Sequence, residues 1–254
     1  MTVVSMTVVY IISAPSGSGK STLVNEVRRL VPGLDFSVSF TTRAPRGSEQ
    51  NGREYFFVTR ADFTAMLRKG EFLEHAEVFG NYYGTSRRFL REATQKDHDL
   101  VLDIDVQGAR QIRQQLPDAA SIFILPPDRK TLEWRLRNRS SDDEEVIQRR
   151  LATAKREIEN YGEYDYILVN DRLEQAADEL KAVVLAERFQ RLGQKLTEDE
   201  QRLATIADRC RLGNARSRVQ PILDSFKDDD PSEDKSSEEG SSKDESSNDD
   251  PLKK

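Results

Sequence analysis

Hydrophobic runs alternate with amphipathic stretches along most of this chain, and the alternation predicts strands and helices in turn. The runs are short, apolar and rich in β-branched residues, which is typical of buried strands. They cover residues 8–12, 100–105, 121–125 and 166–171. The amphipathic stretches with the clearest ends predict helices over 21–30, 87–95 and 173–192. Strands separated by helices indicate an α/β fold, with a parallel sheet flanked by helices and joined by right-handed crossovers.

The pattern changes between the first and second of these strands. Short alternating runs predominate there, together with one short helix at 62–69. The strand-like runs cover residues 36–40, 55–58, 72–78 and 82–86. They predict a small β-rich insert, about 36–90, after the first βα unit.

Two helices rich in charged residues are expected between the last two core strands, at 131–139 and 144–161. Residues 141–144 have the spacing of a capping box, so the first helix ends there and a second one begins. Arg135 and Arg139 are four residues apart and share one helix face. That face is either a solvated basic surface or part of a helical lid, about 129–161, that brings arginines to a phosphate.

The loop after the first strand has the composition that a phosphate-binding loop, or P-loop, requires. It runs Ala14-Pro15-Ser16-Gly17-Ser18-Gly19-Lys20-Ser21-Thr22 and leads into a helix. Glycines let backbone N–H groups converge on an anion, and the helix N-terminus adds unpaired N–H groups and the positive end of its dipole. Lys20 would reach the β- and γ-phosphates of a nucleotide, and the Ser21 hydroxyl would bind Mg²⁺. A plain glycine turn would explain Gly17 and Gly19 but not Lys20-Ser21 in this frame, although Ala14 stands where the strict pattern has glycine.

Charge sets the C-terminal end apart from the rest of the chain. The 254 residues carry a net charge of −6, and residues 227–254 alone hold 11 acidic residues against 5 lysines. The remainder is therefore balanced, which argues against a nucleic-acid groove over the body. Residues 225–254 are expected to be a disordered acidic tail, either solvating or docking. Residues 191–224 predict a helical extension, in which a helix capped at Thr197 continues to Gly213 and packs on the body or on a partner.

Few residues in the chain suit disulfide, metal or membrane functions. The one cysteine, Cys210, excludes an internal disulfide and fits a half-buried helix position better than a catalytic thiol. His75 and His98 are the only histidines, which argues against a histidine-based metal site. No 18-residue apolar run and no signal-like N-terminus are present, so we expect a cytoplasmic protein without a membrane partner. The repeated opening leaves Met1 or Met6 as the start.

Several motifs, taken in sequence order, resemble the guanylate kinase family. They are the loop 13–21, Ser37-Val38-Ser39, Thr41-Thr42-Arg43, Pro45-Arg46, Glu74-His75-Ala76, residues 80–86, Leu102-Asp103-Ile104-Asp105 and Val169-Asn170-Asp171. The resemblance covers roughly residues 7–190. It implies a P-loop NTPase-type core with a GMP-binding insert and a lid. It also implies transfer of the γ-phosphate of ATP to GMP, with Mg²⁺, in purine nucleotide metabolism.

The resemblance implies a role for each matching residue. The Glu74 carboxylate would accept from the N1–H and N2–H₂ donors of guanine, with Ser39 and Thr85 beside the base. The GMP phosphate would meet Arg43, Arg46, Tyr55 and Tyr83. Asp103 and Asp105 would organise the Mg²⁺ water shell and the GMP ribose side, and Asn170 would lie near the adenine of ATP. Lys20, Arg135, Arg139 and Arg150 would neutralise the transferring phosphoryl group.

Other interpretations of these residues stay open. Arg43 and Arg46 could be surface arginines around a proline, the tyrosines could pack in a core, and the aspartates could solvate a strand end. Gly47-Ser48 also departs from many members, which have a small residue or proline followed by glycine.

Three rival functions remain to be weighed: a non-catalytic interaction module of this fold, a sugar-phosphate kinase and a nucleic-acid-linked ATPase. Lys20 argues against the interaction module, and Glu74 argues against the sugar-phosphate kinase. The balanced charge argues against the nucleic-acid-linked ATPase. The sequence leaves the oligomeric state and the role of residues 191–254 open, and truncation after Gly213 is expected to leave turnover nearly intact.

Overall fold

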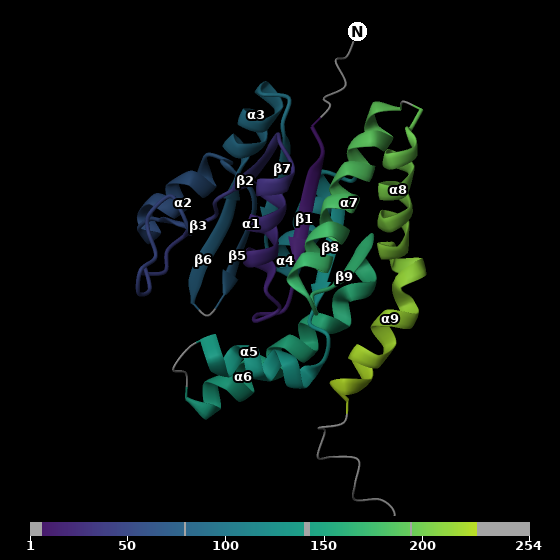
Figure 1. The fold of residues 1–254 in the computed structure, drawn as a ribbon. Helices are drawn as coiled ribbons and strands as arrows, with labels where there is room; N and C mark the ends of the chain where they lie inside the picture. Colours follow the sequence, from purple (N-terminus) through teal and green to yellow (C-terminus); the bar gives the residue numbers. More distant parts are fainter. Residues whose placement is uncertain (1–6, 79, 140–142, 194, 228–254) are drawn as a thin grey trace, which may run out of the picture.

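The chain folds around a five-stranded parallel sheet. The computed structural model describes residues 7–78, 80–139, 143–193 and 195–227. The strands of this sheet, in the spatial order β2-β7-β1-β8-β9, are β2 (Leu34–Ser37), β7 (Asp99–Asp103), β1 (Val9–Ser13), β8 (Ala120–Leu125) and β9 (Tyr166–Val169). Every pairing in it is parallel, and helices cover both faces (Figure 1). The predicted α/β class with a parallel sheet flanked by helices is confirmed.

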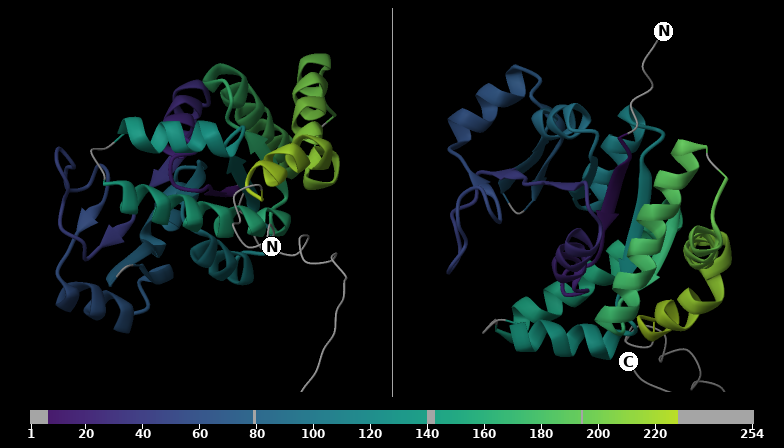
Figure 2. Two further views of the ribbon diagram at one scale, coloured as in Figure 1. Left: turned by 90° about the horizontal axis from the view of Figure 1, so that it is seen from below. Right: turned by 45° about the horizontal axis from the view of Figure 1, so that its top comes forward.

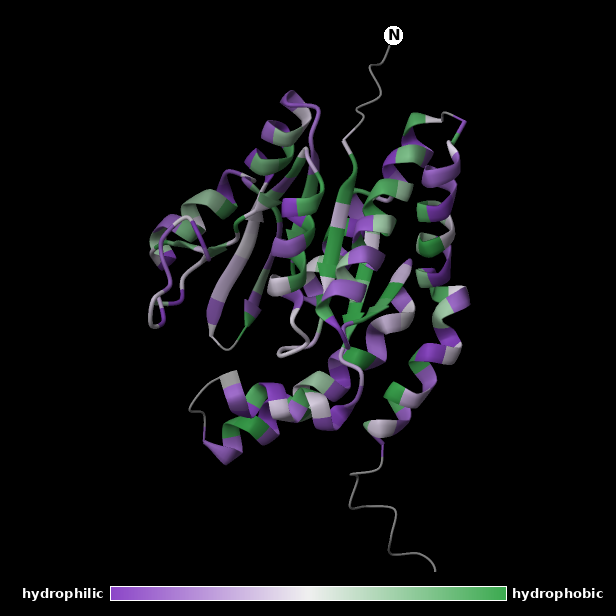
Figure 3. Cartoon of the chain, in the orientation of Figure 1, coloured by the Kyte–Doolittle hydropathy of each residue, from purple (hydrophilic) through white to green (hydrophobic). Residues whose placement is uncertain are grey.

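The strands are hydrophobic throughout because both faces of the sheet are buried. In β1, Tyr10 and Ile12 face one apolar layer, while Val9 and Ile11 face the other. The first layer is covered by α1 (Lys20–Leu30), α7 (Leu173–Leu192) and α8 (Glu198–Cys210). The second is covered by α3 (Arg87–Gln95), α4 (Val106–Gln115) and α9 (Leu212–Ser225), together with the charged helices described below. Figure 3 shows the central strands as a green hydrophobic band between helices of mixed colour.

A second, smaller sheet forms the predicted insert. Its strands, in the spatial order β4-β3-β6-β5, are β4 (Phe56–Phe57), β3 (Phe40–Thr41), β6 (Asn81–Ser86) and β5 (Phe72–Val78). Helix α2 (Arg60–Arg68) packs on it through Phe63, which stacks on Phe72 with ring centroids 4.5 Å apart. The insert therefore has its own small aromatic core.

The predicted single strand over 36–40 is wrong. Leu34–Ser37 pairs with β7 at the edge of the main sheet, whereas Phe40–Thr41 pairs with β6 in the insert. The two aromatic residues of this stretch belong to different cores, because Phe36 packs against the main core and Phe40 packs with Phe72. The alternating pattern gave no sign of this division.

The two charged helices lie beyond the carboxyl ends of the main strands (Figure 1). They are α5 (Arg129–Arg139) and α6 (Glu144–Ile158), and a short 3₁₀ helix, η1 (Glu159–Glu163), follows them. We call α5 and α6 together the lid; they run side by side when seen from below (Figure 2, left). Each buries an apolar stripe in the core, with Leu132 and Leu136 from α5 and Ile147 and Leu151 from α6.

Two further helices follow α7. Helix α8 opens with the capping box expected at Thr197 and buries Ala207 and Cys210 beside α7, so its apolar stripe packs on the body. The expected continuation to Gly213 is wrong, because α8 ends at Cys210 and α9 begins at Leu212. The predicted tail lies, from residue 228 on, outside the described residues. Within the described part, no helix combines the length and apolarity that crossing a bilayer requires.

Candidate active site

A cavity of about 1070 Å³ opens where the main sheet, the insert and the lid meet. It lies at the carboxyl end of β1, which has β7 on one side and β8 on the other. At this position the connections leave in opposite directions, and open α/β sheets bind ligands there. The predicted site residues that line it are Ala14, Pro15, Ser16, Gly17, Gly19, Lys20, Ser21, Thr22, Ser39, Arg46, Tyr55, Glu74, Tyr83, Asp103, Asp105, Arg135 and Arg150.

The loop of residues 14–19 wraps around the N-terminus of α1. Gly17 and Gly19 have φ angles of +92° and +83°, a backbone conformation that side chains with a Cβ rarely adopt. The N-cap residue of α1, Gly19, has no side chain with which to cap the first turn, so the N–H groups there are left for a ligand. Lys20 forms an ion pair with Asp103 at the end of β7 and lies 3.5 Å from the carbonyl oxygen of Ile104. The ammonium group is therefore held at the carboxyl edge of the sheet.

Asn170 contacts this loop through its side-chain amide and helps to hold it in place. Its amide donates to the carbonyl oxygen of Ser18 at 2.7 Å, and a Cβ on Gly19 would lie 2.4 Å from the same amide nitrogen. Asn170 is buried and is not among the residues that line the cavity, unlike the adenine-side position expected for it. Arg135 donates to the Asn170 carbonyl at 2.9 Å, while its Nη1 is buried without a hydrogen-bond partner in the described part of the chain.

Glu74 reaches the cavity because strand β5 is irregular at this point. Phe72 pairs with Ser86 and Glu74 with Thr85, so two residues of β5 advance while β6 advances by one. Such a bulge turns the following side chain to the other face of the sheet. Phe72 consequently enters the insert core, while Glu74 faces the cavity.

Burial governs the chemistry of Glu74. The side chain is only 5% exposed, and the Thr85 hydroxyl donates to it at 2.7 Å. Desolvation, with a smaller contribution from the nearby charge of Asp105, raises the pKa of this carboxyl to about 7, although the Thr85 hydrogen bond acts in the opposite direction. Asp105 itself caps α4 by accepting from the N–H of Gly108 at 2.8 Å.

Gly108 leaves room for the Glu74 carboxylate. A Cβ built on this residue would stand 2.8 Å from one Glu74 oxygen and 3.1 Å from its carboxyl carbon. Side-chain Cβ atoms essentially never come so close, so any larger residue would displace the carboxylate. Nothing in the sequence pattern distinguishes this position from an ordinary helix glycine, so its role could not be predicted.

The arginines after β3 are arranged differently from each other. Arg46 lines the cavity, and its backbone N–H donates to Glu49 at 2.8 Å. Arg43 does not line it; its guanidinium forms a two-pronged ion pair with Glu49, both contacts at 3.0 Å. The Arg43 guanidinium also lies 5.3 Å from the ring centre of Tyr55, which packs edge-on against Tyr83.

The lid contributes both predicted and unpredicted residues. Arg150 lines the cavity, as does its neighbour Arg149, which was not among the predicted site residues. Arg139 is the last residue of α5, and its side chain lies outside the described ones. Glu157 also lines the cavity, seven residues after Arg150 on the same helix face, a spacing that could have identified it. Its carboxylate accepts the N–H of Ser16, and burial raises its pKa.

Comparison with known proteins gives consistent matches. The sequence model of the guanylate kinase family matches residues 6–187. The chain is 61% identical over 223 residues to a guanylate kinase of Koribacter versatilis, covering 87% of this chain and 96% of that protein. It is 49% identical over 201 residues to a guanylate kinase of Escherichia coli K12, covering 78% and 97% respectively. A crystal structure of guanylate kinase from Anaplasma phagocytophilum superposes with a TM-score of 0.59 at 36% identity, covering 72% of this chain and 87% of that one.

Proposed function

The chain belongs to the guanylate kinase family, and from that premise we propose that it transfers the γ-phosphate of ATP to GMP, with Mg²⁺, in the cytoplasm. The observation that carries the proposal is that Lys20, at the start of α1, and Glu74, on strand β5 of the insert, line one cavity. A group that binds phosphate and a group that reads guanine thus face a shared space. The buried, unpaired Cys210 fits a reducing compartment.

We assign the triphosphate of ATP to the 14–19 loop and the start of α1. The uncapped N–H groups of α1 and the ammonium of Lys20 supply donors and positive charge for the β- and γ-phosphates. Among the described residues, the buried Nη1 of Arg135 has no hydrogen-bond partner. A guanidinium nitrogen out of water requires an acceptor, so we assign it a phosphate oxygen of ATP. Asn170 acts indirectly here, by holding the loop in place.

Two oxygen-bearing residues, one at the start of α1 and one at the end of β7, suit Mg²⁺. This ion retains several waters and takes one or two protein oxygens together with substrate phosphates. Ser21 and Asp103 would hold it, and both line the cavity with oxygen donors of the required kind. When bound, Mg²⁺ supplies charge neutralisation at the phosphates. The described residues contain no cluster of three acidic, histidine or cysteine side chains, which agrees with a metal carried mainly by the nucleotide.

Guanine recognition falls to Glu74. Guanine presents N1–H and N2–H₂ on one edge, and a carboxylate accepts from both. Adenine has an unprotonated N1 there, so the buried carboxylate would face a lone pair, at a cost of about 1–3 kcal/mol or more. Thr85 orients the carboxylate, and Ser39 lines the cavity nearby.

The GMP phosphate is assigned to Arg46, Tyr55 and Tyr83, which line the cavity. Guanidinium groups and phenol hydroxyls suit a phosphate dianion. Arg43 would join them only by exchanging its Glu49 partner for phosphate, so we assign it the weaker share. Glu49 meanwhile fixes the loop by accepting the Arg46 N–H.

Phosphoryl transfer requires that the two nucleotides are correctly positioned and that the charge of the phosphates is neutralised. It does not require a strong base, because the GMP phosphate is already an anion. Lys20, Arg135, Arg149 and Arg150 all line the cavity to which both nucleotides are assigned. Exclusion of water by the lid protects the γ-phosphate from hydrolysis.

A coupled ADP-release assay on the full chain tests the proposal. With ATP and Mg²⁺, we expect rapid ADP release with GMP and little with AMP, CMP or UMP. Turnover of AMP at a rate comparable to GMP would refute the role of Glu74. Four inert substrates with intact GMP binding would instead favour a non-catalytic interaction module.

Replacing Gly108 by alanine is expected to raise the KM for GMP by about 10- to 100-fold. The added methyl displaces the Glu74 carboxylate, and hydrogen bonds to charged groups contribute about 1.5–3 kcal/mol. The Tm should not fall, since alanine is more favourable than glycine in a helix by about 1 kcal/mol. Gly162→Ala is the control, because a Cβ there meets nothing within 4 Å. An unchanged KM for GMP in Gly108→Ala would contradict the assignment.

A further inference from the structure

Helix α9 lies beyond residues 6–187, the part that the family model matches, yet it reaches the base of the lid. It starts against β9, where the Leu212 N–H donates to the carbonyl oxygen of Asp165 at 2.9 Å. It ends beside α5, and Figure 1 shows this yellow-green helix running from near β9 toward α5. One end of the helix is therefore attached to the main sheet beside β9, and the other end is attached to α5 of the lid.

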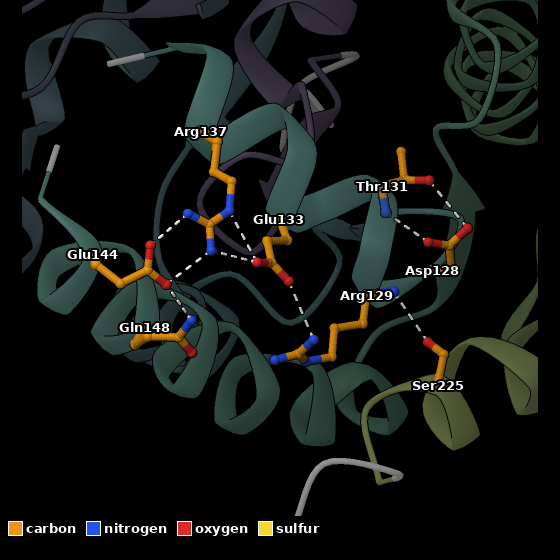
Figure 4. A network of polar contacts seen from close by, with 8 residues as sticks. All are labelled: Asp128, Arg129, Thr131, Glu133, Arg137, Glu144, Gln148 and Ser225. Atoms are coloured by element: carbon orange, nitrogen blue, oxygen red, sulfur yellow. Dashed lines mark hydrogen bonds and ion pairs between the residues drawn. The ribbon is translucent and has the colours of Figure 1, made fainter. Parts of the chain in front are cut away.

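The contact at the lid end is a cap on a helix. The Ser225 hydroxyl accepts from the backbone N–H of Arg129, the first residue of α5, at 3.1 Å (Figure 4). The same hydroxyl donates to the Ile222 carbonyl at 2.6 Å, so it is held in one orientation. Asp128 accepts from the Thr131 N–H at 2.7 Å. Two of the donors that a helix N-terminus leaves unpaired are thus satisfied, one of them by α9.

Apolar contacts extend the same attachment toward the 14–19 loop. Val219, Ile222 and Phe226 lie in one buried cluster with Leu132 and Leu136 of α5. Both leucines are fully buried and lie next to the loop. A Cβ built on Gly17 would lie 2.9 Å from Leu136 and 3.0 Å from Leu132. Leu132 and Leu136 therefore connect the buried cluster that includes the α9 residues to the loop assigned to the triphosphate.

A polar network joins α5 to α6 on the outer side of the lid (Figure 4). Arg129 donates to Glu133 at 3.3 Å, and Arg137 donates to Glu133 at 2.9 and 2.6 Å. Arg137 also grips Glu144 at the start of α6, at 2.5 and 2.8 Å. Arg137 and Glu144 are exposed, whereas Arg129 and Glu133 are half-buried, so each pair stabilises little alone, but as a network they fix α6 relative to α5. Arg149 and Arg150 follow on α6 and line the cavity.

We propose that α9 positions the lid, with Ser225 and its buried neighbours on α9 fixing the base of α5 so that the lid arginines meet the phosphates. Ser225 is a positioning residue, acting through α5. The kinetic part of this inference rests on the proposed GMP kinase activity. It also reverses the sequence-based expectation for truncation after Gly213, because that cut would remove Val219, Ile222 and Phe226 from the main core.

The test replaces Ser225 by alanine in the full chain. Loss of an N-cap shifts an equilibrium by about fivefold, so we expect kcat to fall about fivefold. The KM for GMP should stay unchanged, since Glu74 lies on another element. Trp134, the single tryptophan of the chain, stands 65% exposed on α5. Its fluorescence response to AMP-PNP, Mg²⁺ and GMP should shrink in Ser225→Ala and return in Ser225→Thr, which restores a hydroxyl.

Ser217→Ala is the matched control, because Ser217 is an exposed serine on the same helix. If Ser225→Ala equals Ser217→Ala in kcat and in the Trp134 response, with only a lower Tm, α9 is a structural support and the inference is wrong. Ile222→Ala provides a second, apolar variant that should show the same pattern. A wild-type protein that fails to turn over GMP would refute the proposed function, whereas the fluorescence comparison would still decide the role of α9.

Discussion

Replacing Lys20 by alanine is expected to lower kcat by about 10³-fold or more, through the loss of the cation that neutralises the transferring phosphoryl group. The Lys20 side chain is held by Asp103 and directed into the cavity, so no neighbouring lysine or arginine substitutes for it without rearrangement. Steady-state ADP release at saturating ATP and GMP measures the effect.

Two further variants separate chemistry from packing. Lys20→Met retains most of the side-chain volume and should be as inactive as the alanine variant. Lys96→Ala removes an exposed lysine that pairs with Asp35 and should leave kcat unchanged. If Lys20→Met kept more than a tenth of wild-type activity, the charge of Lys20 would not be the catalytic element.

Much of the architecture was predictable because the core strands are buried on both faces. Residues 8–12 and 121–125 are continuous apolar runs, and the structure has β1 and β8 there, within one or two residues. The loop that carries Gly17, and Lys20 directly after it, were predictable from local spacing alone, since all of this chemistry is contiguous in the sequence. The lid helices were predictable from their charge; the capping box expected at residues 141–144 begins outside the described residues, and the N-cap of α6, Asp143, makes no side-chain cap.

The remainder depends on contacts between distant residues, which periodicity does not encode. The bulge that turns Glu74 toward the cavity is a property of its pairing with β6. Gly108 matters only because Glu74 lies against it, 34 positions earlier in the chain. Arg43, which the sequence places at the GMP phosphate, pairs with Glu49 in the structure, and periodicity does not indicate this pairing. The same holds for Asn170, whose partner is the Ser18 carbonyl oxygen.

Glu74→Gln is expected to lower kcat/KM for GMP by about 10²-fold or more, because guanine offers two donors to this position. A carboxylate accepts from both of them, whereas an amide places its own NH₂ against one. The same ADP-release assay measures the loss. Glu77→Gln, on the exposed side of β5, is the control and should retain wild-type kinetics.

The same substitution should stabilise the ligand-free protein, and the gain should depend on pH. Burial raises the pKa of Glu74 from 4.5 in the unfolded chain to about 7 in the folded one. Between these values the folded state holds a proton that the unfolded chain has released, so the wild-type unfolding free energy falls as the pH rises. The loss reaches about 3 kcal/mol above pH 7, and glutamine, which has no charge, avoids it. Urea unfolding should therefore show Glu74→Gln more stable than wild type at pH 8 and equal to it near pH 4. A difference that is constant across this range would mean that Glu74 is not the buried, destabilising charge through which we expect the site to select guanine.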